Sequence, residues 1–246
     1  MSLFTLYDRG FNYRANSAVF NGTDTYINST ASSMDMGDVV NTSFWIKVTS
    51  LPATNHENVI YLSYTDGSTT EYVFMVGVHS TGAIRISAAT AFTDEQLFSS
   101  VTVADGAWHH VFVTHEFAQD GLRMVIDGDV SNLVTADGIA LTTQGDALLQ
   151  ANVGSTVSLG GTPSQFLDGE LAEVYIDTRD LTADDDFDKF IANGKPLYLG
   201  ENGENPAGFS PLVYFNQPVP NFDVNQGTSP NWTEFGTLTA GSTPHL

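Results

Sequence analysis

Short runs of β-branched and aromatic residues recur along the first two thirds of the chain, and polar turn residues separate them. The runs cover residues 17–20, 25–28, 43–49, 59–64, 71–78, 83–88, 99–103, 108–116, 122–127 and 157–159. The separating turns include Asn21-Gly22, Asp66-Gly67, Thr81-Gly82, Asp105-Gly106, Asp127-Gly128 and Gly160-Gly161. Such regular punctuation is typical of antiparallel sandwiches and barrels. The pattern therefore predicts an all-β fold.

One segment has a helical pattern instead. Its apolar residues recur at spacings of three and four, at Phe187, Phe190 and Ile191. Thr182 suits the N-cap, and the aspartates at 184–186 fall in the first turn, where the helix dipole favours negative charge. The acidic run could also be a calcium loop, but we prefer a capped amphipathic helix. We therefore predict one short helix near residues 183–192.

The pattern of short β-type runs ends at about Pro196. A Gly- and Asn-rich loop precedes one strand-like run at residues 212–215, and the remainder is polar and rich in turns. Four apolar residues in this part, Phe222, Trp232, Phe235 and Leu238, favour a packed tail over a free linker. We therefore divide the chain into a domain of residues 1–196 and a C-terminal extension of residues 197–246, which packs on the domain or on a partner.

Charge limits the choice of partners. The chain has 246 residues, of which 29 are acidic and 8 are basic, so its formal net charge is −21. Such a surface repels phosphate backbones, so we expect no nucleic-acid binding. Cysteine is absent, which excludes disulfides and thiolate metal sites. The N-terminal segment lacks a signal-peptide run and no segment has the length of a membrane helix, so we expect neither general secretion nor membrane insertion.

The segment DGAWHHVFVTHE, at residues 105–116, holds three histidines. It could be a metal site, part of a hydrolase, or a strand. Neighbouring side chains on a strand point to opposite faces, so His109 and His110 cannot bind one ion. His109 and His115 share a face but lie about 20 Å apart, too far for common ligation. We therefore predict a central strand, with Trp108, His110, Phe112 and Thr114 on one face and His109, Val111, Val113 and His115 on the other.

The carboxylates of residues 168–177 resemble the acids of a glycosidase. Retaining enzymes need two carboxylates about 5–5.5 Å apart, and inverting enzymes need roughly 6.5–9.5 Å. Strand alternation predicts that Glu170 and Glu173 face opposite ways, and that Glu173 and Asp177 lie about 13 Å apart. Neither pair has catalytic geometry within the strand, although a partner from another strand stays open.

An ordered set of motifs resembles the laminin-G-like domains of the concanavalin A-like lectin/glucanase superfamily. The resemblance covers about residues 15–196, and it implies a jelly roll of two antiparallel sheets in which Trp-His-His-Val is a structural strand. The motifs are Ala18-Val-Phe-Asn-Gly22, Ser43-Phe-Trp-Ile-Lys47, Asp105-Gly-Ala-Trp-His-His-Val111, Leu122-Arg-Met-Val-Ile-Asp-Gly128, Leu159-Gly-Gly161 and Phe166-Leu-Asp-Gly-Glu-Leu-Ala-Glu-Val-Tyr175.

The resemblance does not carry catalysis with it. Glucanases of the superfamily place their acids as Glu-x-Asp-x-Glu or Glu-x-Asp-x-x-Glu on one strand, and the chain contains neither sequence. Ala172 stands where many relatives have an acidic residue, so no polar role is carried over to that position. We therefore expect a protein that is not an enzyme.

The tail resembles the ends of laminin-G-like proteins of tailed bacteriophages, which are generally structural or surface-exposed virion components. The resemblance rests on Gly203-Glu-Asn-Pro-Ala-Gly-Phe-Ser-Pro-Leu-Val-Tyr-Phe215, Asn225-Gln-Gly-Thr228 and Gly236-Thr-Leu238. It implies a virion protein, in capsid decoration or in a tail fibre, that contacts other virion proteins or host-surface glycans. Assembly in the host cytoplasm agrees with the expected lack of secretion.

Two other functions stay open beside the virion protein: a free lectin-like carbohydrate-binding module and, less favoured, a glucanase. Aromatic residues that could hold a sugar are Tyr64, Tyr72 and Trp232. Many laminin-G-like domains bind one Ca²⁺ ion through loop aspartates and backbone carbonyls. Loop aspartates occur here at Asp66, Asp105, Asp127 and Asp129, without defining a ligand set. Jelly rolls also often build trimeric phage appendages, so a homo-oligomer is a further expectation by analogy.

Overall fold

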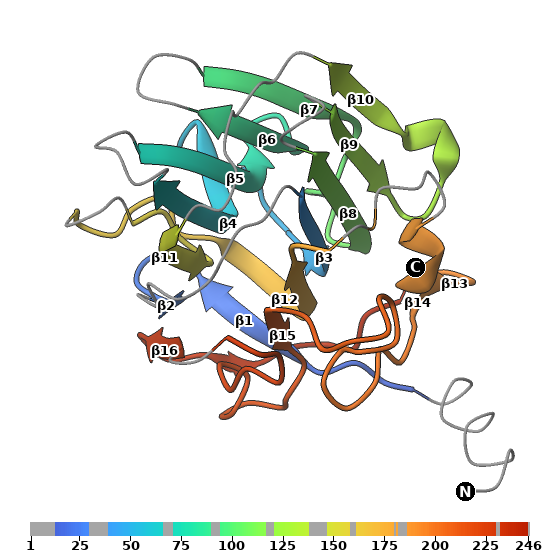
Figure 1. The fold of residues 1–246 in the computed structure, drawn as a ribbon. Helices are drawn as coiled ribbons and strands as arrows, with labels where there is room; N and C mark the ends of the chain where they lie inside the picture. The colour runs from blue at the N-terminus through green and yellow to red at the C-terminus, as the bar shows by residue number, and fades with distance from the viewer. Residues whose placement is uncertain are drawn as a thin grey trace, which may run out of the picture.

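The computed structural model describes residues 13–29, 39–65, 71–89, 94–116, 121–137, 147–157, 161–179, 181, 186–229 and 232–245. Its strands form two large antiparallel sheets that pack face to face, which confirms the predicted jelly-roll sandwich (Figure 1). Sheet A has the order β10-β9-β8-β3-β12-β1-β17, and β15 also pairs with β12. Sheet B has the order β16-β2-β11-β4-β5-β6-β7.

The strand bounds follow the predicted runs closely in the first half of the chain. Sheet A contains β1 (Ser17–Asn21), β3 (Val39–Lys47), β8 (Trp108–Glu116), β9 (Gly121–Ile126), β10 (Val134–Asp137), β12 (Asp168–Asp177), β15 (Val213–Phe215) and β17 (Thr239–Ala240). Sheet B contains β2 (Tyr26–Ser29), β4 (His56–Thr65), β5 (Glu71–His79), β6 (Ala83–Ala89), β7 (Asp94–Thr102), β11 (Ala147–Val153) and β16 (Trp232–Phe235).

Two predictions of local structure were wrong or incomplete. The run at 157–159 is not seen as a strand, because Val157 lies outside any strand and 158–160 fall outside the described residues. The predicted helix is a single 3₁₀ turn, Asp186–Lys189, and the hairpin of β13 (Ile191–Ala192) and β14 (Lys195–Pro196) follows it. Asn193 and Gly194 have φ values of 52° and 67°, so the backbone reverses directly after residue 192, where the predicted helix ends. Residues 182–185 lie outside the described residues.

Two apolar clusters explain the layers. The inner faces of the sheets meet in one core, with Phe44 and Ile46 of β3 and Phe74 and Val76 of β5 among its members. A second cluster covers the outer face of sheet A, and we call it the outer cluster. It joins Trp45, Trp108, Phe112, Ala172, Tyr175, Leu181, Phe187, Phe190, Ile191, Leu199 and Tyr214. The segment after Leu181 therefore packs on sheet A as a third layer.

The C-terminal extension contributes to both sheets. Its strands β15 and β17 pair with β12 and β1 of sheet A, and β16 pairs with β2 of sheet B. Phe215, Phe222 and Leu238 are buried in the core between the sheets. The division of the chain at residue 196 stays a prediction.

Strand β8 confirms the alternation predicted for DGAWHHVFVTHE. Trp108 and Phe112 belong to the outer cluster, whereas Val111 and Val113 belong to the core between the sheets. Strand β12 departs from simple alternation, because its register with β3 shifts between Ala172 and Tyr175. Glu173 has a φ of 51° at this bulge.

The bulge overturns the prediction that Glu170 and Glu173 face opposite ways. Glu170 is opposite Lys47 and bonds its amine, while Glu173 contacts Tyr214 of the outer cluster. Both carboxylates therefore lie on the outer face of sheet A. Within the described residues, no helix is long and apolar enough to cross a membrane.

Candidate functional site: a pocket at the rim of sheet A

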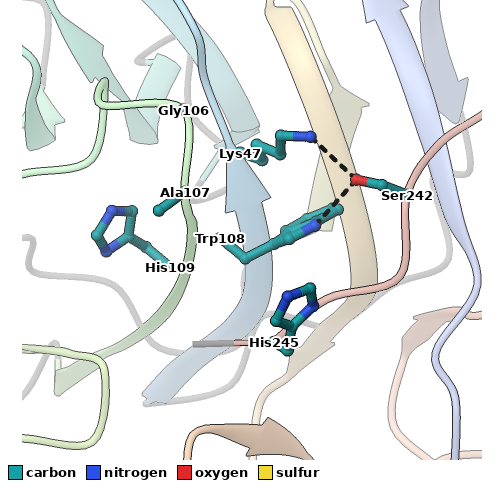
Figure 2. A pocket seen from close by; sticks show the side chains of 7 residues that line it. All are labelled: Lys47, Gly106, Ala107, Trp108, His109, Ser242 and His245. Carbon is teal, nitrogen blue, oxygen red and sulfur yellow. Dashed lines mark hydrogen bonds between the residues drawn. The ribbon is translucent and has the colours of Figure 1, made fainter.

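A pocket of about 470 Å³ lies where β3 ends and β8 begins, and we call it the rim pocket (Figure 2). The C-terminal segment after β17 closes one side of it. Its lining residues are Lys47, Gly106, Ala107, Trp108, His109, Ser242 and His245.

The register of β3 with its two neighbouring strands places residues of the pocket lining side by side. Lys47, the last residue of β3, is opposite Trp108 on β8 and opposite Glu170 on β12. These three side chains form one row across the sheet, because opposite residues share a face. The Asp105-Gly106 turn places Trp108, since the Asp105 carboxylate accepts the Ala107 N–H at 2.8 Å.

Ser242 fixes the C-terminal segment on this row. Its hydroxyl oxygen accepts hydrogen bonds from Lys47 Nζ at 3.0 Å and from Trp108 Nε1 at 3.1 Å (Figure 2). Its hydroxyl and its backbone N–H both donate to Glu170 Oε2, at 2.9 Å and 2.5 Å. Lys47 Nζ also lies 2.9 Å from Glu170 Oε1. Burial alone would raise the pKa of Glu170, but the hydrogen bonds from Ser242 and Lys47 lower it below its ordinary value.

His109 stands between two carboxylates at the pocket wall. Its Nδ1 lies 2.9 Å from Asp127 Oδ2, and its Nε2 lies 3.1 Å from Asp105 Oδ1. Burial would lower the pKa of His109, but the hydrogen bonds and charges of Asp127 and Asp105 outweigh it and raise the pKa above its ordinary value. His109 therefore carries positive charge more readily than a free histidine does.

The other two histidines of β8 lie elsewhere. His110 is fully buried beside Ser43, and its Nε2 is 2.9 Å from the Ser43 hydroxyl. Burial lowers the pKa of His110 to about 3, against the opposing charge of Asp127, so its ring is neutral. His115 stacks on Phe74 between the sheets at 6.0 Å. The three histidines thus lie in three separate environments, which agrees with the prediction that residues 108–116 form a strand and not a metal site.

His245 completes the pocket from the C-terminal side. It is exposed, and its Nδ1 lies 3.0 Å from the carbonyl oxygen of Thr243. Figure 2 shows its imidazole below the Trp108 indole and on the pocket side of the segment. The rim pocket therefore combines a largely buried tryptophan with an amine, a hydroxyl and two imidazoles, a mixture of apolar and convergent polar groups that small-ligand sites use.

A protein-family model described as the concanavalin A-like lectin/glucanases superfamily matches residues 21–185. The chain belongs to this superfamily. No curated protein sequence matches it at a significant level.

Solved structures share the superfamily fold at low identity. The native heptameric SAP-like pentraxin from Limulus polyphemus aligns with a TM-score of 0.62 and 12% identity, over 93% of this chain and 95% of that chain. A proposed carbohydrate binding protein from Bacteroides ovatus aligns at 0.59 and 10% identity, over 93% of this chain and 60% of that one. The CBM40 of the Ruminococcus gnavus IT-sialidase, bound to α2,3 sialyllactose, aligns at 0.50 and 13% identity, over 69% of this chain and 94% of that one. At these identities the likenesses show the fold alone.

Two carboxylates of β12, Glu170 and Glu173, are engaged by neighbouring side chains. Glu170 is held by Lys47 and Ser242 at the edge of the pocket. Glu173 is buried, and the hydroxyls of Tyr13 and Tyr214 both donate hydrogen bonds to it. A substrate in the rim pocket would meet neither a free acid nor a free base among these two residues.

The structure separates the aromatic residues predicted to hold a sugar. Tyr64 and Tyr72 are opposite each other on β4 and β5 of sheet B, and their side chains lie outside the described part of the chain. Trp232 is on β16, at the edge of sheet B and three strands from β4. Its ring packs edge-on against Phe215 at 5.1 Å, and its N–H donates to the Ser229 hydroxyl at 2.9 Å. A sugar-binding role for these residues stays a prediction.

Two of the four loop aspartates considered for calcium, Asp105 and Asp127, both contact His109. The carboxylates of Asp105 and Asp127 each have an oxygen hydrogen-bonded to a ring nitrogen of His109. Ca²⁺ prefers a shell of oxygen ligands, so an imidazole between these two carboxylates does not suit it. Asp66 lies outside the described residues. Within the described part, no group of three or more histidine, aspartate or glutamate side chains could hold a metal ion. Calcium binding stays a prediction, and these two residues do not fit it.

The pocket was not predicted from the sequence, although the family motifs contain five of its seven lining residues. Lys47 and Trp108 occur in the family motifs, where they were interpreted as parts of strands. Ser242 and His245 are about 135 residues away from Trp108 in the chain, and only the pairing of β17 with β1 brings them near it. The two histidines and the tryptophan beside a turn were the available signal.

Proposed function

We propose that the chain is a non-enzymatic, lectin-like module that binds carbohydrate in the rim pocket. The observation that carries the proposal is a pocket of about 470 Å³ in which the exposed His245 lies beside Lys47, Ser242 and the largely buried Trp108. A pyranose offers hydroxyls to polar groups and C–H groups to apolar surface, so it suits a pocket that combines both. Two of the solved structures with this fold are described as carbohydrate binding, which supports the choice of ligand.

The proposal of no enzymatic activity rests on the carboxylates of β12. Glycoside hydrolysis needs one carboxylic acid that protonates the leaving group. It also needs a second carboxylate, which acts either as the nucleophile or as the base that activates a water. Glu170 is ion-paired to Lys47, and Glu173 is enclosed by two tyrosines. Neither residue is available to a bound glycan.

A glycan array tests binding in the rim pocket. We expect the intact chain to bind a subset of printed glycans and His245→Ala to lose at least about tenfold in affinity for them. His245 is exposed and, within the described residues, hydrogen-bonds only to Thr243 of its own segment, so its removal should leave the fold intact. His79→Ala, at the end of β5 in sheet B, is the matched control and should bind as the original chain does. Equal binding by all three proteins would contradict the pocket assignment.

We also propose that this lectin-like module is displayed on a bacteriophage particle, where it contacts other virion proteins or host-surface glycans. The observation that favours display is the tail, whose residues 203–215 and 236–238 resemble the ends of phage proteins and include β15. Immunogold electron microscopy of lysate from the source culture is the test. Gold on particles is the expected result, and its position distinguishes capsid from tail; bare particles with labelled cells or medium would contradict display.

Self-association is a further part of the proposal, since the Limulus pentraxin with the same fold is heptameric. Sedimentation equilibrium of the intact chain tests it. A single species at the monomer mass of 26.5 kDa across micromolar concentrations would contradict a homo-oligomer.

A further inference from the structure

A stacked pair of aromatic rings lies at the edge of sheet B, away from the rim pocket. Tyr26 of β2 and Phe235 of β16 are opposite each other, with ring centroids 4.6 Å apart and planes within 3°. Phe166 lies against Tyr26 at 6.0 Å and an angle of 49°. We call these three rings the aromatic ledge.

The aromatic ledge points outward from the sandwich. Ile27, the next residue on β2, is buried in the core between the sheets, so alternation turns Tyr26 to the outer face. Strand β16 forms one edge of sheet B, and Phe235 is 42% exposed. Within the described residues, neither Tyr26 nor Phe235 belongs to either apolar cluster. The rings therefore lie at the surface, where they do not serve the core.

A row of polar side chains runs beside the ledge on the same face. Thr233 of β16 is opposite Asn28 of β2, and Asn28 is opposite Asn152 of β11. Asn28 Nδ2 donates to Asn152 Oδ1 at 2.6 Å and to the Ala151 carbonyl at 3.4 Å. This bonding commits the amide nitrogen of Asn28 and leaves its Oδ1 as the acceptor available to a ligand.

Asn152 is a second sign of unused hydrogen-bonding capacity. It is fully buried, and its Nδ2 has no partner among the described residues. Buried donors are nearly always paired, so an unpaired one next to a half-exposed asparagine marks a place where a ligand or water completes the network. Asn152 acts through Asn28 and is therefore a positioning residue.

We infer that the aromatic ledge, with Asn28 and Thr233, is a second carbohydrate-binding surface, selective for neutral glycans. The open face of the Phe235 ring would stack on the C–H face of a hexose. The hydroxyls of the hexose would then reach Asn28 Oδ1 and the Thr233 hydroxyl. The net charge of −21 disfavours an acidic glycan at an exposed site without a cation. Residues 232–235 lie outside the segment 21–185 that matches the superfamily, so Phe235 of the ledge and the neighbouring Thr233 come from outside the matched segment.

Binding to an array of neutral glucose, galactose, mannose and N-acetylglucosamine oligosaccharides tests the ledge. We expect Phe235→Ala to lower the affinity of the intact chain for a subset of them by about tenfold. Phe235→Leu keeps an apolar contact with Tyr26 but removes the aromatic face, so it should lose the same signals if the fold is retained. Phe98→Ala is the matched control, because Phe98 is 40% exposed on β7, the opposite edge strand of the same sheet. It should bind as the original chain does.

The ledge and the rim pocket can fail separately. Glycans lost by the Phe235 variants belong to the ledge, and glycans lost by His245→Ala belong to the pocket. The ledge is overturned if both Phe235 variants bind like the original chain, if Phe98→Ala loses the same signals, or if the original chain binds no neutral glycan. Loss of binding in the Phe235 variants alone would support the ledge even where the pocket assignment fails.

Discussion

Glu173 carries a carboxyl group into the outer cluster, where Tyr13 and Tyr214 both donate hydrogen bonds to it. The bulge that places it there requires a φ of 51°, which residues other than glycine rarely adopt. Burial raises the pKa of Glu173 to about 7, although the two tyrosine hydroxyls oppose the rise. The Tyr13 contact also fixes the start of the described chain on sheet A.

The raised pKa predicts that this residue destabilises the fold as the pH increases. Below pH 4.5 the carboxyl is protonated in both the folded and the unfolded chain. Between pH 4.5 and about 7 it is ionised in the unfolded chain but still protonated in the folded one. The free energy of unfolding therefore falls as the pH rises through this range. The full loss is about 3 kcal/mol for a shift from 4.5 to about 7. Glu173→Gln should therefore match the original chain at pH 4 and exceed its stability at pH 8, measured by urea unfolding.

The comparison between the two proteins isolates Glu173, because every other acid is common to both. Glu57→Gln is a useful control: burial also raises the pKa of Glu57, but this carboxylate accepts a hydrogen bond from the Asp168 N–H at 3.0 Å instead of bonding to two tyrosines. A Glu173→Gln protein with the same pH profile as the original chain would contradict a buried, protonated Glu173.

At the level of single residues, alternation worked for β8 and failed for β12. Trp108 to His115 follow the predicted faces because β8 pairs without a break with β3. The extra residue at Glu173 turns the side chains after it to the faces opposite to those that alternation predicts. Neither neighbour of Glu173 is a glycine or a proline, so the sequence gives no sign of the bulge. The partners of Glu173 are 160 and 41 positions away in the chain, so its burial could not be predicted from its neighbours.

Among the elements, turn chemistry was the dependable signal. The Asn-Gly, Asp-Gly and Thr-Gly pairs mark real strand ends, and Gly22, Gly82, Gly106 and Gly128 all have positive φ. Strand β11, ALLQANV, was missed because it contains good helix formers, and pairing with β2 and β4 decides its conformation. The helix was predicted too long because packing of Phe187 and Phe190 on sheet A, rather than local preference, decides the backbone there.

Gly154, directly after β11, tests how closely the two sheets approach. It has a φ of 85°, and a β-carbon there would overlap the ring of Phe20 on β1, which is fully buried. Gly154→Ala should therefore destabilise the fold by about 2–4 kcal/mol, through backbone strain and overpacking together. Chemical unfolding of the purified protein measures this loss.

Gly208 provides the matched control for the same strain without the overlap. Its φ is 81°, and a β-carbon there would have no atom within 4 Å. Gly208→Ala should cost only about 1 kcal/mol. Equal losses in the two variants would mean that Phe20 does not press on Gly154 as the structure indicates.

For the whole molecule, composition and ordered motifs predicted the fold class, and three-dimensional pairing created the candidate site. The rim pocket needs Lys47, Trp108 and Ser242 together, and the last of these arrives only when the C-terminal segment crosses from β16 in sheet B to β17 in sheet A. The superfamily match ends at residue 185, before that segment. A sequence pattern based on the family therefore could not reveal the pocket.

The central claim is that carbohydrate binds beside Trp108, and the three tryptophans of the chain allow a direct measurement. Their indole N–H groups give three separate signals in a ¹H–¹⁵N correlation spectrum, from Trp45 in the outer cluster, Trp108 in the pocket and Trp232 beside Phe215. The intact chain would be titrated with the oligosaccharide that binds most strongly on the array and loses binding in His245→Ala. We predict a saturable shift of the Trp108 signal while the Trp45 signal stays in place. An unmoved Trp108 signal at saturating oligosaccharide, or an array with no bound glycan, would contradict the account.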